Sequence, residues 1–281
     1  MSAGTLPQRP HAAQARPGRG ARRRGGRRRL RPLLIVPALV AVFLYLPIAI
    51  VALFSFNASR SLAAFDGFSL RWYERMLHDG DLWASVALSV QIAALTAVVS
   101  LAIGTALALA LRRLRGIAAG APSLLLTLAL ITPEIVLGFS LLMMFTTLDV
   151  PLSRWTIAVG HITFSLAFVT LIVRARLAML RDDLEEAAMD LGATRWQSLR
   201  LVVLPQLWPA LLGAGMLVFV LSFDDFVISL FTSGVGTSPL PVRIYSMIRF
   251  GVTPEINAIA TLMMVASIAI GVASIALTRR R

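Results

Sequence analysis

The feature that most constrains this chain is a series of long apolar stretches along its 281 residues. A lipid bilayer has a hydrocarbon core of about 30 Å, which an α-helix crosses with roughly 20 apolar residues. The sequence therefore predicts an all-α polytopic membrane protein with about six transmembrane helices. The six stretches that meet or approach the required length are Leu33–Phe54, Val86–Leu111, Ser123–Phe145, Trp155–Val173, Gln206–Phe223 and Ile256–Leu277.

The composition excludes several classes of function. With 57% hydrophobic and 15% charged residues and a mean hydropathy of +0.79, the chain is too apolar for a water-soluble enzyme. It has no cysteine and three histidines, which argues against disulfides and against a metal site. All 27 basic residues are arginines, so the lysine of a phosphate-binding P-loop is missing. The chain is therefore not expected to bind ATP through a P-loop of its own.

The arginines predict the orientation in the membrane. Residues 1–31 contain 10 arginines and no acid, and we interpret residues 1–32 as a disordered cytoplasmic tail before a transmembrane domain over 33–281. With both termini in the cytoplasm, 21 arginines lie on the cytoplasmic side and 6 on the external side, as the positive-inside rule requires. A nucleic-acid-binding arm is the alternative for the tail. An arginine run directly before an apolar span favours a topology signal or contact with anionic lipid, so no nucleic-acid partner is expected.

Prolines fall within several of the expected spans. Each proline removes a backbone donor and kinks or breaks a helix, which suggests a bundle with moving parts. Proline is also generally commoner in membrane helices than in soluble ones, and this explains Pro37 and Pro47 in the first span. The others are Pro133 in the third span and Pro205 and Pro209 at the entry to the fifth.

Residues 174–200 form a polar segment with a strongly patterned sequence. Apolar residues from Leu177 to Leu191 recur at helical spacing, and acidic residues occupy most positions between them. Gly192 then predicts a left-handed helix end, and Thr194 with Gln197 predicts a capping box that starts a second short helix. A loop with this much local structure is more plausibly a docking element than a passive connector.

Glu186-Ala187-Ala188, Gly192, Val202 and Leu204-Pro205 follow one another at a characteristic spacing. With this spacing the segment resembles the EAA loop of ABC importer membrane subunits. In that family the loop forms a coupling helix, here within 174–204, which sits in a groove on a separate ATP-binding subunit. The resemblance implies a type I importer (MetI-like) permease fold, with ATP and Mg²⁺ bound by the partner and no cofactor on this chain. The residues that match the pattern are Glu186, Ala187, Ala188, Gly192, Val202, Leu204 and Pro205, with Val202 where the pattern usually has isoleucine.

Glu186 has a second interpretation. With Asp183 as the N-cap, Glu186 is the third residue of a capping box, and capping and docking can coexist.

Further stretches between about residues 41 and 277 are similar to the spermidine/putrescine permeases of the PotC type. This resemblance implies a polyamine-like substrate, a second permease subunit, a dimer of ATP-binding subunits, an extracytoplasmic solute-binding protein and a place in the bacterial inner membrane. The similar stretches include Leu44-Tyr45-Leu46-Pro47, His161-Ile162-Thr163-Phe164, Ser222-Phe223-Asp224-Asp225 and Ile244-Tyr245-Ser246-Met247.

Three acids in or beside the apolar spans are candidates for the substrate pathway. An ionised carboxylate at the centre of a membrane helix costs on the order of 3 kcal/mol on insertion scales, so such acids are functional candidates. Glu134 follows Pro133, and Asp224 and Asp225 follow the fifth span. Together with aromatic faces such as Tyr245, these carboxylates suit a polycation. The aspartates also fit a helix cap or a pair with Arg243 or Arg249. His161 fits a packed polar residue better than a proton relay.

Two other classes of function use the same residues. In a self-contained proton-coupled carrier, the three acids would bind protons and 174–200 would act as a gate. In a membrane anchor, that segment would recruit a soluble partner, but an anchor has no use for acids within the membrane. An ABC permease for another small solute is a further alternative.

Overall fold

The computed structural model describes residues 30–61, 63–114, 117–180 and 183–279. Within these ranges every regular element is a helix, and the one β-type pairing is an isolated bridge between Asn57 and Phe68. The predicted all-α class is therefore confirmed for the described residues. The chain divides into two compact units, Met1–Ile48 and Ala49–Arg281. Residues 1–29 of the expected tail lie outside the described residues.

Helix α1 (Leu30–Phe54) contains the described part of the first unit and continues into the second. It begins three residues before the expected start at Leu33, inside the expected tail. Pro37 and Pro47 both lie within one continuous helix. Their presence therefore reflects the general tolerance of membrane helices for proline rather than a break.

Five helical runs are long and apolar enough to cross a membrane, and a sixth span is possible as a bent pair of helices. This count agrees with the expected six spans. The five runs are Val36–Phe54, Gly80–Arg113, Arg154–Ala178, Arg195–Phe223 and Pro254–Ala273.

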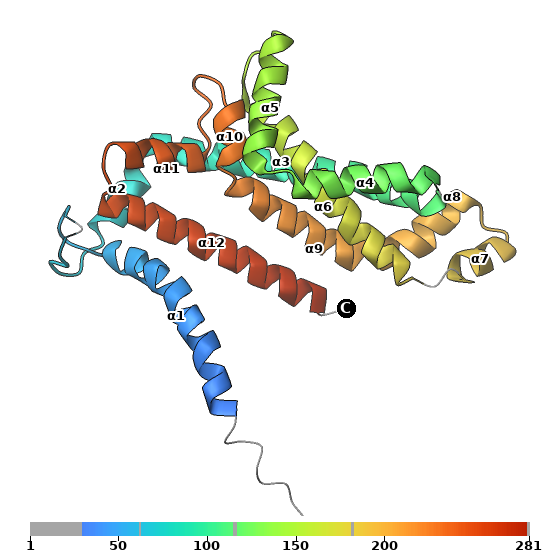
Figure 1. Ribbon diagram of the computed structural model, residues 1–281, viewed down its shortest axis with the longest axis horizontal. Coiled ribbons are helices and arrows are strands. Elements are labelled where there is room, and N and C mark those ends of the chain that lie inside the picture. Colours follow the sequence, from blue (N-terminus) through green and yellow to red (C-terminus); the bar gives the residue numbers. More distant parts are fainter. Residues whose placement is uncertain (1–29, 62, 115–116, 181–182, 280–281) are drawn as a thin grey trace, which may run out of the picture. The chain divides into compact units, whose positions relative to one another are not determined.

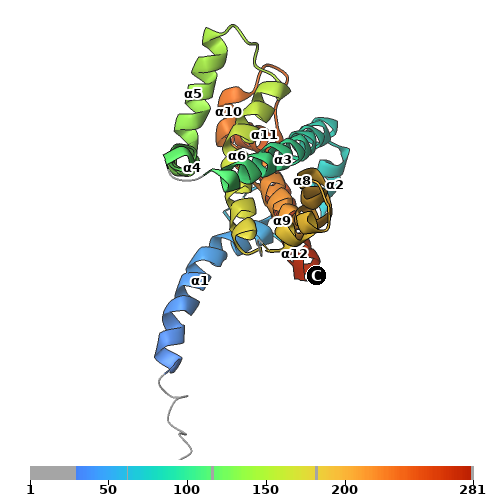
Figure 2. The same cartoon turned by 90° about the vertical axis from the view of Figure 1, so that its right-hand side faces the viewer.

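The third expected span is broken. Helix α4 (Ile117–Ile131) is followed by helix α5 (Glu134–Thr147), and the bend between Gly120–Ile131 and Glu134–Thr147 is 105°. Figures 1 and 2 show the change of direction. The break falls inside the expected span Ser123–Phe145, at the proline that the sequence predicts to kink or break it. Pro133 explains the break, because it has no N–H to donate and its ring disfavours helical backbone in the preceding residue. Pro133 itself is extended, with φ −57° and ψ 134°.

The core of the second unit forms where α3 (Gly80–Arg113), α6 (Arg154–Ala178) and α9 (Leu204–Phe223) pack together. Small residues at spacings of three or four along α3 allow this close approach, because lipid supplies no hydrophobic driving force between helices. At Gly104 an added Cβ would lie 2.8 Å from Cβ of Val169 on α6. The small buried residues of α3 are Ser85, Ser89, Ala93, Thr96, Ala97, Ser100, Gly104, Thr105 and Ala108.

Short helices lie at the two ends of α3 (Figure 1). Helix α2 (Arg71–His78) and helix α11 (Leu240–Arg249) lie at its N-terminal end, and α11 leads into α12 (Pro254–Arg279), which packs on α9. Arg243 of α11 is 3.2 Å from the carboxylate of Asp79, which is the N-cap of α3. The other end of α3 faces the segment that contains the predicted coupling helix.

Replacing Gly104 by alanine is expected to lower the free energy of unfolding by about 1–3 kcal/mol, because the new methyl group overlaps Val169 and forces the helices apart. The matched control is Gly120→Ala in α4, where an added Cβ meets nothing within 4 Å. This control removes a helical glycine without creating an overlap and is expected to be neutral or stabilising. Thermal unfolding in detergent measures both variants, and equal effects would contradict the packing argument.

Candidate functional site

The acidic cluster within residues 174–200 begins a helix of its own. Helix α7 spans Asp183–Asp190 and has Asp183, Glu185 and Glu186 in its first turn. Because α6 ends at Ala178, a single helix along the apolar stripe is wrong. Three carboxylates are better placed in a first turn, at the positive end of the helix dipole, than in the middle of a longer helix.

Gly192 ends α7 as the sequence predicts. Its φ is +90°, in the left-handed region that glycine adopts without strain. Its N–H donates to the carbonyl of Met189, at 2.9 Å, and the N–H of Ala193 donates to the carbonyl of Ala188, at 3.0 Å. These two bonds form a Schellman motif, which satisfies carbonyls that the helix end leaves free. Replacing Gly192 would therefore strain the turn that follows α7.

The capping box of Thr194 and Gln197 is also confirmed. The hydroxyl of Thr194 accepts from the backbone of Gln197, and the side chain of Gln197 accepts from the backbone of Thr194. This box starts α8 (Arg195–Ser198), which continues through a π-helical turn (Leu199–Val203) into α9. A separate second short helix is therefore wrong, because Arg195–Phe223 is one helical run.

The π-helical turn explains how the run tolerates Pro205. In an α-helix, Pro205 would leave the carbonyl of Leu201 without its donor and would crowd it. In a π-helical turn the backbone hydrogen bonds join residues i and i+5, so the helix is locally wider and has room for the proline ring. The amide nitrogen of the Gln206 side chain donates back to the carbonyl of Val202, at 2.9 Å.

The residues that match the EAA pattern differ in exposure. Glu186, Ala187, Gly192 and Pro205 are exposed, whereas Ala188 and Leu204 are half-buried. The sequence did not single out Leu191, which is 90% exposed, or Trp196, which is 66% exposed, for docking. Large exposed apolar side chains beside a charged helix are typical of an interaction surface. The candidate docking surface therefore extends to both.

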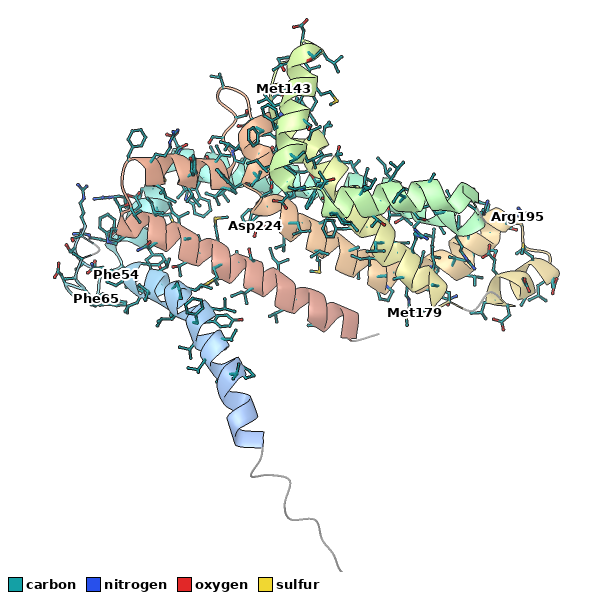
Figure 3. The ribbon with its side chains drawn as sticks, viewed as in Figure 1. Phe54, Phe65, Met143, Met179, Arg195 and Asp224 are labelled. Carbon is teal, nitrogen blue, oxygen red and sulfur yellow. The ribbon has the colours of Figure 1, made fainter. Side chains whose placement is uncertain are left out.

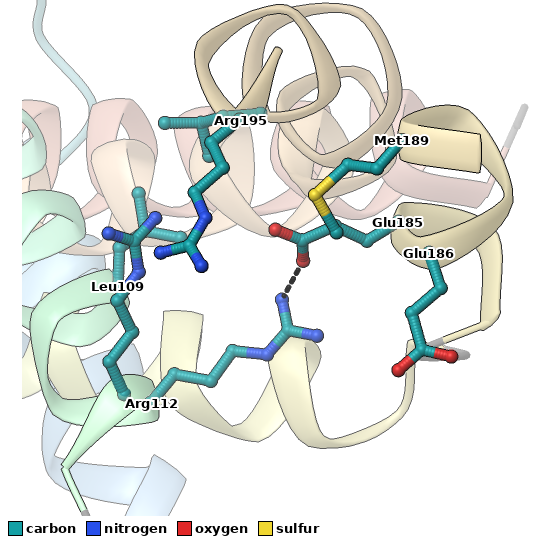
Figure 4. A pocket seen from close by; sticks show the side chains of 8 residues that line it. Leu109, Arg112, Glu185, Glu186, Met189 and Arg195 are labelled. Atoms are coloured by element: carbon teal, nitrogen blue, oxygen red, sulfur yellow. Dashed lines mark hydrogen bonds and ion pairs between the residues drawn. The ribbon is translucent and has the colours of Figure 1, made fainter. Parts of the chain in front are cut away.

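An ion pair joins α7 to α3. A nitrogen of the Arg112 guanidinium donates to the Glu185 carboxylate at 3.0 Å, beside a cavity of about 500 Å³ (Figure 4). Figure 4 shows that Glu186 turns away from Arg112. Sequence reasoning missed this pair, because nothing local relates residues 73 positions apart. The cavity is lined by Leu109, Arg112, Arg113, Glu185, Glu186, Met189, Arg195 and Leu199.

The two adjacent aspartates occupy different environments at the break between α9 and α10 (Val227–Thr232). Asp224 follows the last residue of α9 and is exposed (Figure 3). Asp225 has only 10% of its side chain exposed and accepts from the backbone N–H of Ser229, at 3.0 Å. Asp225 therefore caps α10, as one interpretation of the sequence proposed.

His161 on α6 connects the helices around this break. Its Nε2 lies 2.9 Å from the Asp225 carboxylate and 3.1 Å from the Ser229 hydroxyl, and its Nδ1 lies 2.6 Å from the Ser222 hydroxyl. The side chain is only 3% exposed. The interpretation of His161 as a packed, hydrogen-bonded residue is confirmed.

The pairing of the aspartates with Arg243 or Arg249 is not found among the described contacts. Arg243 bonds to Asp79 instead, and the guanidinium of Arg249 lies 5.6 Å from the centre of the Tyr245 ring.

Glu134 and Tyr245 lie near the same break. Glu134 is exposed in the first turn of α5, and its carboxylate is close enough to Asp224 and Asp225 to interact electrostatically with both. Tyr245 is 39% exposed, and its ring centre lies 4.7 Å from that of Phe226. The structure thus brings the four residues of the expected substrate pathway to one region.

This region presents negative charge and aromatic faces but no arrangement for a metal. Two exposed carboxylates beside two aromatic rings can bind ammonium groups by ion pairing and by cation–π contact. Among the described residues, no group of three or more histidines and acids is placed to hold a metal ion.

Comparison with known proteins identifies the class. Residues 100–281 match the family model "Binding-protein-dependent transport system inner membrane component". The chain is 39% identical over 241 residues to the Haemophilus influenzae spermidine/putrescine transport system permease protein PotC, covering 86% of this chain and 94% of that protein. It is 38% identical over 240 residues to the Escherichia coli (strain K12) putrescine transport system permease protein PotI, covering 82% and 85%.

Solved structures show the same fold. The crystal structure of a bacterial ABC transporter involved in the import of the acidic polysaccharide alginate aligns with a TM-score of 0.73 at 14% identity, covering 89% of this chain and 95% of that chain. The inward-facing MetNI methionine ABC transporter aligns with a TM-score of 0.60 at 20% identity, covering 71% and 95%.

These likenesses define a multi-pass membrane protein with the fold of type I ABC importer permeases. The chain belongs to the family of binding-protein-dependent transport system inner membrane components.

Replacing His161 by alanine is expected to lower the free energy of unfolding by about 3 kcal/mol, because the buried Asp225 carboxylate and two serine hydroxyls lose their partner. Asp224→Asn removes an exposed charge and is expected to change stability by less than about 0.5 kcal/mol. Thermal unfolding in detergent compares the two variants. Similar losses for both would show that the His161 contacts do not support the break.

Proposed function

We propose that the chain is a permease subunit of an ATP-driven importer for polyamines such as putrescine and spermidine. The observation that carries the substrate class is the identity of 37–39%, over 82% or more of the chain, to permeases named for these two polyamines. One fold can serve many functions, so the named relatives and not the fold indicate polyamines as the substrate.

The chemistry of the break between α9 and α10 supports a polycation. Polyamines carry several ammonium groups separated by short hydrocarbon segments, which need carboxylates and apolar or aromatic walls in alternation. Glu134 and Asp224 offer exposed carboxylates, and Tyr245 with Phe226 offers aromatic faces. Asp225 is already engaged by His161 and by the cap of α10. We therefore assign direct contact with the substrate to Glu134, Asp224 and Tyr245.

The proposed assembly contains this chain, a second permease, a dimer of ATP-binding subunits and an extracytoplasmic solute-binding protein. One structural neighbour is an alginate ABC transporter in complex with a pentasaccharide-bound periplasmic protein, aligned with a TM-score of 0.66 at 15% identity, covering 89% of this chain and 94% of that chain. ATP and Mg²⁺ bind on the partner ATPase. The chain lies in a bacterial inner membrane, with both of its termini on the cytoplasmic side.

Coupling uses the surface around α7. Glu186, Ala187 and Ala188 enter a groove on the ATPase. The Gly192 turn, with Leu204 and Pro205, fixes how α7 connects to the membrane helix α9. When ATP binding closes the ATPase dimer, the groove moves α7, and the two permease subunits change between inward and outward access. The substrate then reaches the carboxylates from one side of the membrane at a time.

Uptake of labelled putrescine and spermidine tests this function directly. The whole transport system is expressed in cells that lack their own polyamine importers. Uptake that requires an intact ATPase partner and the solute-binding protein supports the proposal. Uptake by this chain alone, driven by a proton gradient, would instead favour the self-contained carrier.

Asp224→Asn and Glu134→Gln are each expected to raise the KM for spermidine about tenfold, because a charge-assisted hydrogen bond contributes about 1.5 kcal/mol. The initial rate of uptake, measured over a range of spermidine concentrations, gives this value. Asp149→Asn is the matched control, because the Asp149 side chain is exposed. Its backbone φ of 54° lies in the left-handed region, which asparagine also adopts. An unchanged KM in both site variants would remove these acids from the pathway.

Glu186→Arg is expected to reduce uptake by about tenfold or more and to lose the ATPase on purification, because it reverses an exposed charge in the docking surface. Membrane insertion and thermal stability should stay normal. The control is Glu74→Arg, which makes the same change at an exposed position in the first turn of α2, another eight-residue helix, at the opposite end of α3. Normal uptake in the Glu186 variant would refute docking through this residue.

A further inference from the structure

The ion pair between Arg112 and Glu185 indicates how the coupling helix is held in position. Arg112 lies in the last turn of α3, where a cation is favoured by the negative end of the helix dipole. Glu185 lies in the first turn of α7, where an anion is favoured by the positive end. The pair therefore joins the complementary ends of two helices that are far apart in the sequence.

The side chains of helix α7 are all exposed or half-buried. None of its eight residues is buried, so it lacks the packed apolar face that usually holds a helix in place. Leu184 is 42% exposed and lines a small gap with Val202 and Val203 of the π-helical turn. A directional contact such as the 3.0 Å bond from Arg112 is suited to fix the rotation of α7 about its own axis.

The pair is partly shielded from water. The exposed fractions of the two side chains are 27% for Arg112 and 24% for Glu185. At this depth the attraction between opposite charges is stronger than on an open surface. Arg113 and Arg195 line the same cavity and add positive potential around the Glu185 carboxylate. Rotating α7 so that Glu185 left this cavity would expose the Glu185 carboxylate to water and separate it from the arginines that line the cavity.

The adjacent side chains of Glu185 and Glu186 then point in different directions. Successive residues on a helix project about 100° apart, so holding Glu185 against α3 directs Glu186 elsewhere. Figure 4 shows the Glu186 carboxylate turned away from Arg112, and its side chain is exposed. The orientation of the residue expected to dock therefore depends on its neighbour.

We propose that Arg112 and Glu185 are positioning residues for coupling: their ion pair ties α7 to the cytoplasmic end of the long transmembrane helix α3 and holds Glu186 toward the ATP-binding subunit. This inference rests on the proposed function. It assigns to Glu185 a role inside the chain and leaves the contact with the ATPase to Glu186. Through this pair, a displacement of α7 by the ATPase is passed directly to α3.

A double-mutant cycle on the full chain in its complex tests the pair. Glu185→Gln is measured in the chain with Arg112 and in the chain that carries Arg112→Ala. The readout is the ratio of ATP hydrolysis stimulated by the spermidine-loaded binding protein to basal hydrolysis. We expect Glu185→Gln to lower this ratio about fivefold when Arg112 is present and less than about twofold in the Arg112→Ala background. Equal factors in the two backgrounds, or no loss in either, would overturn the proposal.

Glu74→Gln is the matched control in the same cycle, because Glu74 is exposed in the first turn of α2, at the opposite end of α3, and should leave the ratio unchanged in both backgrounds. Glu186→Gln should lower the ratio by a smaller factor in the Arg112→Ala background than in the chain with Arg112, because Glu186 is no longer held toward the ATPase once the pair is lost. Arg112→Lys should keep a larger ratio than Arg112→Ala, because it retains the charge. Equal factors for Glu186→Gln in the two backgrounds would overturn the proposal that the pair positions Glu186.

Cross-linking provides a readout that does not depend on the substrate. The chain contains no cysteine, so Arg112→Cys and Glu185→Cys can be introduced together without removing native thiols. A short bifunctional thiol reagent should link this pair in native membranes faster than the pair Arg112→Cys and Glu186→Cys. Equal or slower linking would overturn the proposed contact.

The failures of the two proposals are distinguishable. If cells expressing the whole system take up no polyamine, the substrate assignment fails. The cross-linking rates, and retention of the ATPase on purification across the same cycle, still decide whether the ion pair positions α7.

Discussion

Backbone groups within a membrane must find hydrogen-bond partners inside the protein, and the rest of the structure depends on this constraint. Long helices satisfy it along most of the chain. Where a helix stops, nearby groups take over. Asp225 accepts from the first turn of α10. In the polar segment outside the membrane, the carbonyls at the end of α7 likewise accept from the turn at Gly192. The interruptions are thus supported structural elements, and both candidate sites lie beside them.

The local structure was largely predictable from the sequence because its causes are local. Runs of apolar residues predicted the spans, Gly192 predicted a left-handed helix end, and Thr194 with Gln197 predicted a capping box. Pro133 marked a possible kink, but the sequence does not set its angle, because the direction of α5 depends on its packing against α10. The same limit applies to Pro205, where a widened turn keeps the helix continuous.

The candidate sites were predictable in composition but not in arrangement. The sequence indicated Glu134, Asp224, Asp225 and Tyr245, and the structure brings them to one region. The different environments of Asp224 and Asp225 could not be inferred, because they depend on His161 from another helix. The ion-pair partner of Glu185 could not be inferred from the sequence either, since Arg112 precedes it by 73 residues. Both cases require knowledge of which helices are neighbours.

The break between α9 and α10 has an electrostatic consequence that follows from helix direction. Helix α9 ends at Phe223, so the negative end of its dipole meets Asp224, whose own charge adds to it. The positive ends of α5 and α10 also meet this region, and Glu134 and Asp225 oppose them. The negative potential is therefore concentrated at Asp224. An approaching cation encounters its deepest attraction at one end of the acidic cluster, which gives the cluster a polarity that the three carboxylates alone would lack.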